Sequence, residues 1–265
     1  MKIRGVSGFS QHVVAEGDKE GPAVLFVNAL GTDLTVWDRV VSLLPSSWRL
    51  IRYDMRGHGD SGTPPAPYLL DDLVQDAVDV LSALNVGKCL VVGLSIGGLV
   101  GQQLALVRPN LVAGLFLSST APRIGTVQLW NDRIDFVRAS GLRSMADDVI
   151  RRWFSTGYRA EFPREARQWT EILCRTSNEG YIGCCHVLRD TDLADRVMDV
   201  SCPIAVVGGS EDVATPPDVV IAGSRSLSAS VCITIEGAGH LPCVERPDET
   251  AGLLRRFVSE LPSLG

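Results

Sequence analysis

Short, continuous apolar runs alternate with amphipathic segments along most of this chain. The continuous runs are typical of strands that are buried on both faces. The amphipathic segments repeat their apolar positions every three or four residues, as helices with one buried face do. This alternation predicts an α/β fold with a mostly parallel sheet flanked by helices. The expected strands are residues 12–15, 23–27, 49–53, 89–92, 112–117, 204–207 and 231–235, and the expected helices are 34–44, 69–84, 99–107, 217–227 and 251–258.

The alternation stops between about residues 123 and 200. This stretch has no clear strand pattern but several helical ones, for example around residues 145–153. We therefore expect residues 1–122 and 201–265 to form the sheet-containing core, and residues 123–200 to form an inserted helical cap. The insertion holds twelve of the chain's 22 arginines and twelve acidic residues. It is thus neutral and rich in arginine, whereas the core is acidic.

Composition and charge narrow the class of protein. With 45% hydrophobic and 21% charged residues in 265 positions, the chain is an ordinary globular sequence rather than a disordered or fibrous one. The net charge of -6 and the lack of a basic run argue against nucleic acid as a partner. No apolar secretory segment follows the start, and the seven cysteines form no CxxC pair, so we expect reduced thiols in a cytoplasmic protein. The oligomeric state stays open, a homo-oligomer included.

The longest uncharged stretch, residues 89–107, has the nominal length of a membrane span. Its middle, however, is the sequence GLSIGG at residues 93–98, and two glutamines follow, so we expect a strand, a sharp turn and a helix instead. Small residues around Ser95 allow such a turn and leave the serine hydroxyl exposed. The G-x-S-x-G pattern alone is a weak signal, but between a buried strand and a helix it predicts a nucleophile and no contact with a membrane.

A nucleophilic serine needs a histidine base, and in this kind of site the histidine comes last along the chain. His12 and His58 precede Ser95, and His186 falls in the helical insertion. His240 lies in a glycine-rich loop directly after the last expected strand. We therefore expect His240 to be the base.

The acid that orients the histidine belongs in a loop after an earlier strand. Asp212 follows the strand at residues 204–207 and begins the turn into the next helix. Its neighbour Glu211 is the alternative. The loop after residues 112–117 offers no acid, so Asp212 is the expected third member.

Acyl transfer also needs two backbone N–H groups aimed at the developing oxyanion. Ile96, directly after the nucleophile, is expected to supply one. The other is expected from Leu30, in the sequence NALGTD at residues 28–33 after an early strand. That loop is equally a simple turn into a helix, with Asp33 as its N-cap.

These motifs together resemble the α/β-hydrolases, and more narrowly the 3-oxoadipate enol-lactonases. The sequence YDMRGHGDS at residues 53–61 is shared by many α/β-hydrolases and specifies little. The narrower resemblance rests on NALGTD, on Trp130 to Arg133 in the insertion, and on YIGCC and LRD at residues 181–185 and 188–190. His186 and Ile96 stand where such proteins more often carry alanine and methionine.

The resemblance implies a small anionic lactone with an acetate arm as substrate, and no metal or organic cofactor. Arg133 is implied as the cation for the carboxylate. Trp130 lies one helical turn earlier, so both side chains can face one cavity, although Trp130 fits a core position equally well. Two other readings stay open. One is another hydrolase activity on an ester, a lactone or a carbon–carbon bond, and the other is a non-catalytic ligand-binding protein of the same fold.

Overall fold

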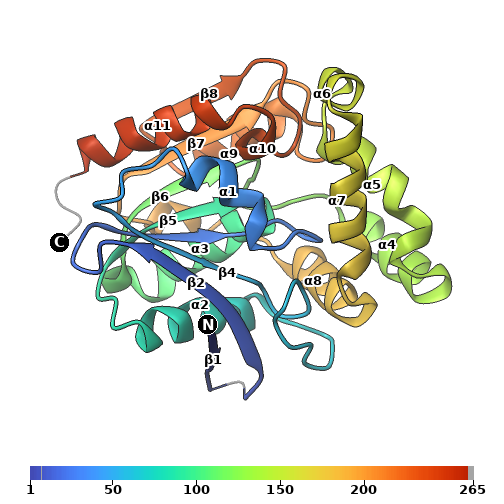
Figure 1. Ribbon diagram of the computed structural model, residues 1–265, viewed down its shortest axis with the longest axis horizontal. Coiled ribbons are helices and arrows are strands. Elements are labelled where there is room, and N and C mark those ends of the chain that lie inside the picture. Colours follow the sequence, from blue (N-terminus) through green and yellow to red (C-terminus); the bar gives the residue numbers. More distant parts are fainter. Residues whose placement is uncertain (7, 262–265) are drawn as a thin grey trace.

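One eight-stranded sheet runs through the molecule in a computed structural model that describes residues 1–6 and 8–261 (Figure 1). The strand order is β1-β2-β4-β3-β5-β6-β7-β8. β2 runs antiparallel to β1 and β4, and all other neighbours are parallel, which confirms the expected mostly parallel sheet. The strands are β1 (Lys2–Arg4), β2 (Ser10–Gly17), β3 (Ala23–Val27), β4 (Arg49–Tyr53), β5 (Cys89–Leu94), β6 (Val112–Ser118), β7 (Ile204–Gly209) and β8 (Val231–Ile235).

The central strands form the core, because every residue of β3, β5, β6 and β7 is buried. This is the burial that continuous apolar runs predict. Among the strands of residues 1–6 and 8–261, only β1 lacks a sequence signal, because its three residues are too few for a periodicity. All seven cysteines are free thiols, and four of them are buried.

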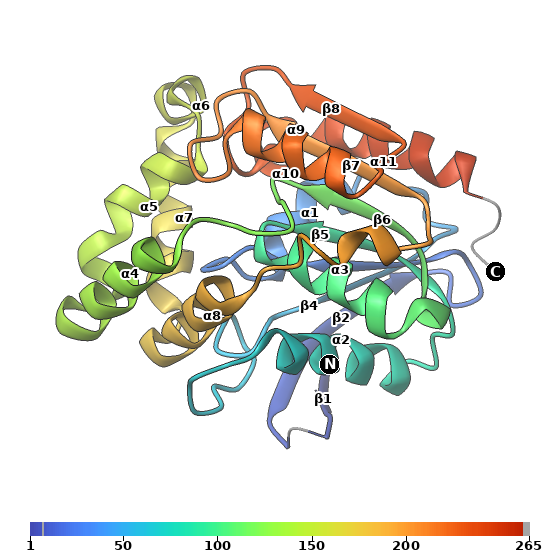
Figure 2. The same ribbon diagram turned by 180° about the vertical axis from the view of Figure 1, so that it is seen from behind.

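Helices cover both faces of the sheet. One face carries α1 (Asp38–Val41) and α11 (Pro247–Glu260), which lie toward the viewer in Figure 1. The other face carries α2 (Leu70–Ala83), α3 (Ile96–Val107) and α9 (Pro217–Ser226), as Figure 2 shows. The expected helix at residues 34–44 is shorter and mixed. It starts as a 3-10 turn, Leu34–Trp37, capped by the Asp33 side chain, and continues as α1.

The described chain between β6 and β7 contains helices but no strand. These are α4 (Val127–Ser140), α5 (Ala146–Trp153), α6 (Thr156–Glu161), α7 (Pro163–Arg175) and α8 (Asn178–Asp190). In both ribbon views they lie together beside one end of the sheet (Figures 1 and 2). We keep the name cap for residues 123–200, and the division of the chain at those two positions stays a prediction.

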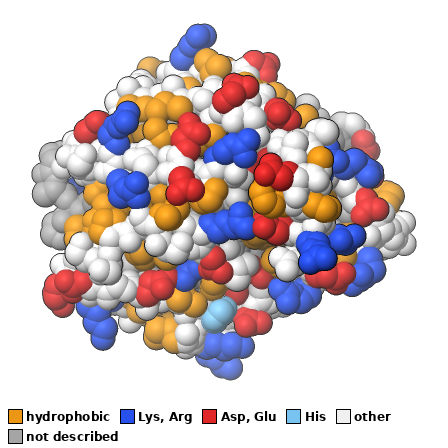
Figure 3. Space-filling view, turned by 45° about the horizontal axis from the view of Figure 1, so that its top comes forward, with side chains coloured by type: hydrophobic (Ala, Val, Ile, Leu, Met, Phe, Trp, Pro, Cys, Tyr) orange, Lys and Arg blue, Asp and Glu red, His pale blue; other side chains and the backbone are white. Residues whose placement is uncertain are grey.

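Within the described ranges, no helix combines the length and the apolarity that crossing a bilayer requires. The uncharged stretch at residues 89–107 is instead divided into β5, the turn residue Ser95 and α3. On the face drawn in Figure 3, basic and acidic side chains are interspersed, so neither sign of charge dominates that surface.

Candidate active site

Ser95 occupies a strained turn between β5 and α3. Its backbone has φ +56° and ψ −118°, a conformation that costs a residue with a side chain free energy. The Ser95 N–H donates to Ser118 O at 2.9 Å, and the Thr120 hydroxyl donates to Ser95 O at 2.8 Å. Because Ser118 ends β6 and Thr120 lies two residues beyond it, the end of that strand holds Ser95 in one orientation.

The flanking glycines are required by close backbone contacts. A Cβ on Gly93 would lie 2.5 Å from Gly97 O, and a Cβ on Gly97 would lie 2.3 Å from Val27 O. Heavier residues would push α3 away from both neighbours. The second contact also brings the helix N-terminus against the end of β3, where the loop with Leu30 begins. The G-x-S-x-G spacing is thus explained by packing on both sides of the nucleophile.

Asp212 and His240 form a buried pair. Nδ1 of His240 donates to Oδ2 of Asp212 at 2.8 Å, and their side chains are 5% and 0% exposed. The other carboxylate oxygen, Oδ1, accepts the N–H groups of Ala214 and Thr215 at 2.7 and 2.9 Å. Since Asp212 fixes the proton on Nδ1, the free nitrogen of the ring is Nε2, the position from which a base acts on a serine.

The structure distinguishes the expected triad residues from the alternatives Glu211 and His186. Ser95 and His240 line the same pocket, although they come from different ends of the chain. Glu211 is exposed, and its backbone, not its carboxylate, contacts the histidine loop through Ala238 O. His186 lies on α8 and is not among the described residues that line this pocket.

Leu30 and Ile96, the expected oxyanion donors, lie close to Ser95, because Leu30 lines the same pocket and Ile96 follows Ser95 in the chain. Both are buried, and Leu30 lines the pocket beside Ser95. Within residues 1–6 and 8–261, neither backbone N–H donates a hydrogen bond to another protein group. Buried N–H groups are nearly always paired. Two unpaired donors beside a nucleophile are therefore available to a developing anion.

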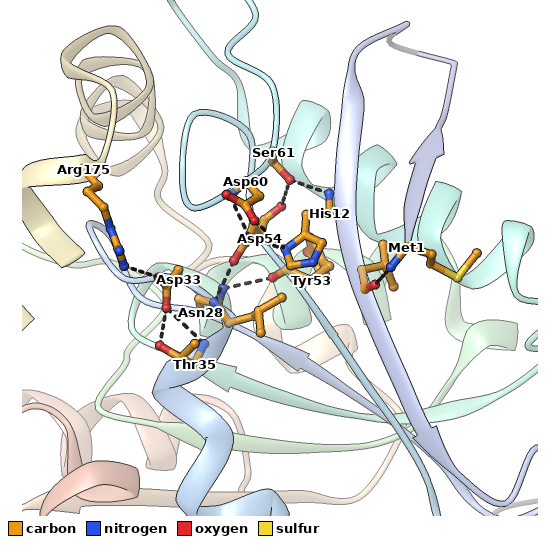
Figure 4. Close-up of polar contacts among 12 residues, drawn as sticks. Met1, His12, Asn28, Asp33, Thr35, Tyr53, Asp54, Asp60, Ser61 and Arg175 are labelled. Atoms are coloured by element: carbon orange, nitrogen blue, oxygen red, sulfur yellow. Dashed lines mark hydrogen bonds and ion pairs between the residues drawn. The ribbon is translucent and has the colours of Figure 1, made fainter.

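Polar contacts with the segment that follows β4 hold the loop that carries Leu30 (Figure 4). The Asn28 amide donates to Tyr53 O at 2.9 Å. The N–H of Leu34 donates to Asp54 at 2.7 Å, and His12 donates to the same carboxylate at 2.8 Å. These contacts tie the loop after β3 to the loop after β4. The widely shared motif at residues 53–61 thus supports the loop that carries Leu30.

His58 holds the same loop one residue beyond Leu30. Its Nε2 accepts the Gly31 N–H at 2.9 Å, and its Nδ1 donates to Arg56 O at 3.0 Å. This pairing requires a neutral ring, since an imidazolium has no acceptor. Burial lowers the pKa of His58, which favours the neutral form. Gly31 itself has φ +84°, and a Cβ there would lie 2.6 Å from Leu173 of α7.

The cap forms the opposite wall of the pocket. Trp130 and Arg133 both line it, as their one-turn spacing on α4 predicts. The Trp130 indole N–H donates to Ile124 O at 2.7 Å, and the guanidinium carbon of Arg133 lies 5.5 Å from the Trp130 ring centre. Arg133 also donates to the Tyr181 hydroxyl at 3.1 Å. Trp130 thus belongs to the core and to the pocket wall at the same time.

Sequence reasoning missed three polar groups that line this pocket. They are Arg152 and Tyr181 from the cap and Thr215 from the core. Burial raises the pKa of Tyr181 to about 12, so its hydroxyl stays protonated beside Arg133. The signal for Arg152 was its position three residues after Val149, which faces the same pocket. An arginine at the edge of an amphipathic pattern is otherwise read as a solvated residue.

Hydrogen bonds join the cap to the histidine loop. The backbone N–H of His240 donates to Trp153 O at 2.8 Å. The buried Glu245 accepts the Gly239 N–H at 2.8 Å and the Ser155 hydroxyl at 2.6 Å. The C-terminal end of α5 and the loop that carries His240 are therefore fixed to each other.

The described residues contain no group of three or more His, Cys, Asp or Glu side chains placed to hold a metal ion. What they do bring together is a serine, a histidine paired with an aspartate, two unpaired N–H donors, and cations on the facing wall. This arrangement is suited to acyl transfer on an anionic substrate.

Fold and site together define a class of protein. The model of the Alpha/beta hydrolase family matches residues 24–253. The chain therefore belongs to the alpha/beta hydrolase family, which confirms the expected fold.

Among its relatives, 3-oxoadipate enol-lactonase 2 of Acinetobacter baylyi is 34% identical over 233 residues, which is 87% of this chain and 86% of that protein. 3-Oxoadipate enol-lactonase 1 of the same organism is 30% identical over 263 residues, 98% of this chain and 97% of that protein. The crystal structure of the enol-lactonase from Burkholderia xenovorans LB400 has a TM-score of 0.91 and 29% identity, covering 98% of this chain and 100% of that one. These relationships confirm the resemblance to enol-lactonases and identify the chain as a carboxylic ester hydrolase.

Proposed function

We propose that this protein is a serine hydrolase that opens 3-oxoadipate enol-lactone to 3-oxoadipate, in the catabolism of aromatic compounds. The observation that carries the proposal is one pocket in which Ser95 and the Asp212–His240 pair face Arg133 on the cap. The triad can carry out acyl transfer, and the arginine can select a substrate that bears a carboxylate. The similarity to two enol-lactonases supports this choice of substrate.

Acylation starts when Nε2 of His240 takes the proton of Ser95 and Oγ attacks the lactone carbonyl carbon. The carbonyl oxygen then carries the negative charge, and the N–H groups of Leu30 and Ile96 stabilise it by about 3–4 kcal/mol per donor. Asp212 holds the imidazolium that forms. When the tetrahedral intermediate collapses, the ring C–O bond breaks and its electron pair leaves on the enol oxygen.

The leaving group stays attached to the acyl-enzyme, because the bond that breaks lies within a ring. Ketonisation of the enolate takes away its nucleophilicity and disfavours reclosure. His240 can next activate a water molecule, which attacks the ester carbonyl and releases 3-oxoadipate with Ser95 restored. Every proton in this cycle moves through His240 or solvent, and the proposed steps use no metal or organic cofactor.

Arg133 fits the role of carboxylate ligand for the acetate arm. It is half-buried, lies on the Trp130 ring and is hydrogen-bonded only to the Tyr181 hydroxyl among the described groups. A guanidinium held in this way has donors left for a carboxylate and little freedom to lose on binding. The Tyr181 hydroxyl fixes its orientation.

A substrate panel tests the proposal against the other hydrolase activities. The wild-type protein is expected to turn over 3-oxoadipate enol-lactone with a higher kcat/KM than simple aryl esters or a vinylogous diketone. A preference for the diketone would identify a carbon–carbon bond hydrolase, and a preference for neutral esters would identify a general esterase. A protein that hydrolyses none of them and resists labelling by a serine-directed organophosphonate would be a ligand-binding member of the family.

The proposal also covers the partner of the protein and its location in the cell. A small anionic lactone is the proposed partner, and a cytoplasmic location with no nucleic-acid or membrane partner fits the charge and composition of the chain. Self-association can be measured by sedimentation of the purified protein.

A further inference from the structure

The pocket wall carries a second arginine that the mechanism above does not use. Arg152 lies on α5 and lines the pocket together with Ser95 and Arg133. It makes no hydrogen bond or ion pair with any other residue among positions 1–6 and 8–261. Its neighbour Arg151 shows the ordinary behaviour of a cap arginine, because it is exposed and pairs with Asp148 one turn away.

Arg152 is half-buried against a second cation. Its burial, and next the nearby Arg133, lower the pKa of Arg152, whereas Asp212 and Tyr181 act in the opposite direction. Two guanidinium groups on one wall without a protein carboxylate between them are unfavourable until an anion binds. The pair therefore marks a place where negative charge is expected, either in the substrate or during its reaction.

The two arginines differ in the parts of the chain that adjoin them. Arg152 adjoins Trp153, whose carbonyl accepts the N–H of His240 at 2.8 Å. Its electrostatic neighbours include the triad residue Asp212 as well as Arg133. Arg133 is instead held within the cap, by the Tyr181 hydroxyl at 3.1 Å and the Trp130 ring at 5.5 Å. Arg152 thus lies on the triad side of the pair, and Arg133 lies on the far side.

We infer that Arg152 is a catalytic cation for the oxygen that leaves the acyl carbon, while Arg133 holds the carboxylate of the substrate. This inference rests on the proposed acyl transfer at Ser95, and it deepens it by assigning the leaving group. In the enol-lactone the ring oxygen lies between the carbonyl carbon and the carbon that bears the acetate arm. A substrate bound at Arg133 by its arm and at Ser95 by its carbonyl places that oxygen between them, on the side of Arg152.

The charge on this oxygen appears in one step. Oγ of Ser95 bonds to the carbonyl carbon, and its proton passes to His240. Collapse of the intermediate restores the C=O bond and breaks the ring C–O bond, whose electron pair becomes the enolate. Arg152 stabilises this enolate until the proton held by His240, or one from solvent, reaches its carbon and forms the ketone. A fixed cation is most effective at such a developing charge where water is excluded.

Crossed variants and substrates test the assignment. The variants are Arg152→Gln, Arg133→Gln and the matched control Arg151→Gln. The substrates are the enol-lactone with its acetate arm and the neutral enol-lactone that carries a methyl group in place of the arm. Both release the same type of enolate, so Arg152→Gln is expected to lower kcat/KM by about 100-fold on both. Arg133→Gln is expected to act on the first substrate only, and Arg151→Gln on neither.

An effect of Arg152→Gln on the carboxylate substrate alone, seen mainly in KM, would overturn the inference, because Arg152 would then be a second ligand for the arm. Circular dichroism of each variant excludes loss of fold as the cause. Arg152→Lys, which keeps the charge, is expected to recover part of kcat on both lactones.

A series of aryl esters separates this inference from the choice of substrate. If the wild type opens neither lactone, the proposed function fails, but ester hydrolysis still reports on Arg152. The Arg152→Gln variant is then expected to lose more rate as the leaving phenol becomes more basic. An equal loss across the series would show that Arg152 does not act on the leaving oxygen.

Discussion

The backbone N–H of His240 donates to the carbonyl of Trp153 at 2.8 Å, so the catalytic histidine loop is bonded directly to the last residue of a cap helix. The cap wall and the base are thus positioned by the same contact. A change in the position of α5 moves Arg152 and His240 together. We therefore expect the cap to affect catalysis, although it carries no member of the triad.

Glu245 strengthens this junction, and its removal is expected to weaken both fold and activity. Its buried carboxylate accepts N–H groups of Gly239 and Ser155 as well as the Ser155 hydroxyl. Glu245→Ala leaves these donors unpaired and is expected to lower the free energy of unfolding by about 2–4 kcal/mol. We also expect a fall in kcat, because Gly239 precedes His240. Urea denaturation and steady-state kinetics measure the two effects.

The exposed Glu260, at the end of α11, provides the control. Glu260→Ala is expected to change the free energy of unfolding by less than about 0.5 kcal/mol. If Glu245→Ala proved as stable as this control, the junction would not depend on the carboxylate.

The strain at Ser95 predicts a conflict between stability and activity. Ser95→Gly relieves the unfavourable φ of +56°, whereas Ser95→Ala keeps a Cβ in the same conformation. Both variants lack the nucleophile and are expected to be inactive. The glycine variant is expected to be more stable than the alanine variant by about 1 kcal/mol, after the entropic cost of glycine is counted. Equal melting temperatures would show that the turn stores no strain.

Much of this site could be predicted from the sequence because its signals are local. The buried runs at β3, β5 and β7 and the tight turn at Ser95 each depend on a few neighbouring residues. The order serine, acid, histidine then removes His12 and His58, and the loops after the last two strands favour His240 and Asp212, with Glu211 as the alternative. The burial of Asp212 and His240 and their hydrogen bond are what the structure adds.

Arg152 and Tyr181 could not be predicted in the same way. The face that a helix presents to the pocket depends on how α5 packs against α7 and how α8 packs against α4, which the spacing along one helix does not determine. The 3-10 start of the helix after Asp33 was missed for a related reason. Apolar spacing alone fits one longer helix at this place. The structure instead has a 3-10 turn, Leu34–Trp37, which the Asp33 side chain caps.

His58 predicts a loss of stability in mild acid. Its pKa in the unfolded chain is about 6.5, and burial lowers the pKa in the folded protein. As the pH falls below about 6.5, His58 therefore becomes protonated in the unfolded state but not in the folded state, and the free energy of unfolding decreases. The decrease stops at the folded-state pKa and amounts to about 1.4 kcal/mol per unit of difference.

The His58→Gln variant lacks this titration. We expect the stability difference between wild type and variant to be largest at pH 8 and to shrink as the pH falls from about 6.5 toward 5. Urea denaturation of both proteins at each pH gives this difference, and contributions from other titrating groups cancel in it. A difference that is constant with pH would mean that His58 titrates equally in both states.

Arg133 is expected to act on binding of the carboxylate arm. Arg133→Ala should raise KM for the anionic enol-lactone by about 10- to 100-fold and leave KM for the neutral methyl lactone nearly unchanged. The control is Arg138→Ala on the same helix, because Arg138 is exposed and pairs with Asp135 at 3.3 Å. Steady-state kinetics with both lactones provide the comparison. Equal changes with the two lactones would mean that Arg133 contacts no substrate carboxylate.

The central claim is that Ser95 opens the enol-lactone by covalent catalysis. The most direct measurement is kcat/KM for 3-oxoadipate enol-lactone with the wild type and with Ser95→Ala, following formation of 3-oxoadipate. We predict ready turnover by the wild type and a loss of at least about 10⁴-fold in the variant. Near wild-type turnover by Ser95→Ala, or no turnover by the wild type, would contradict the account.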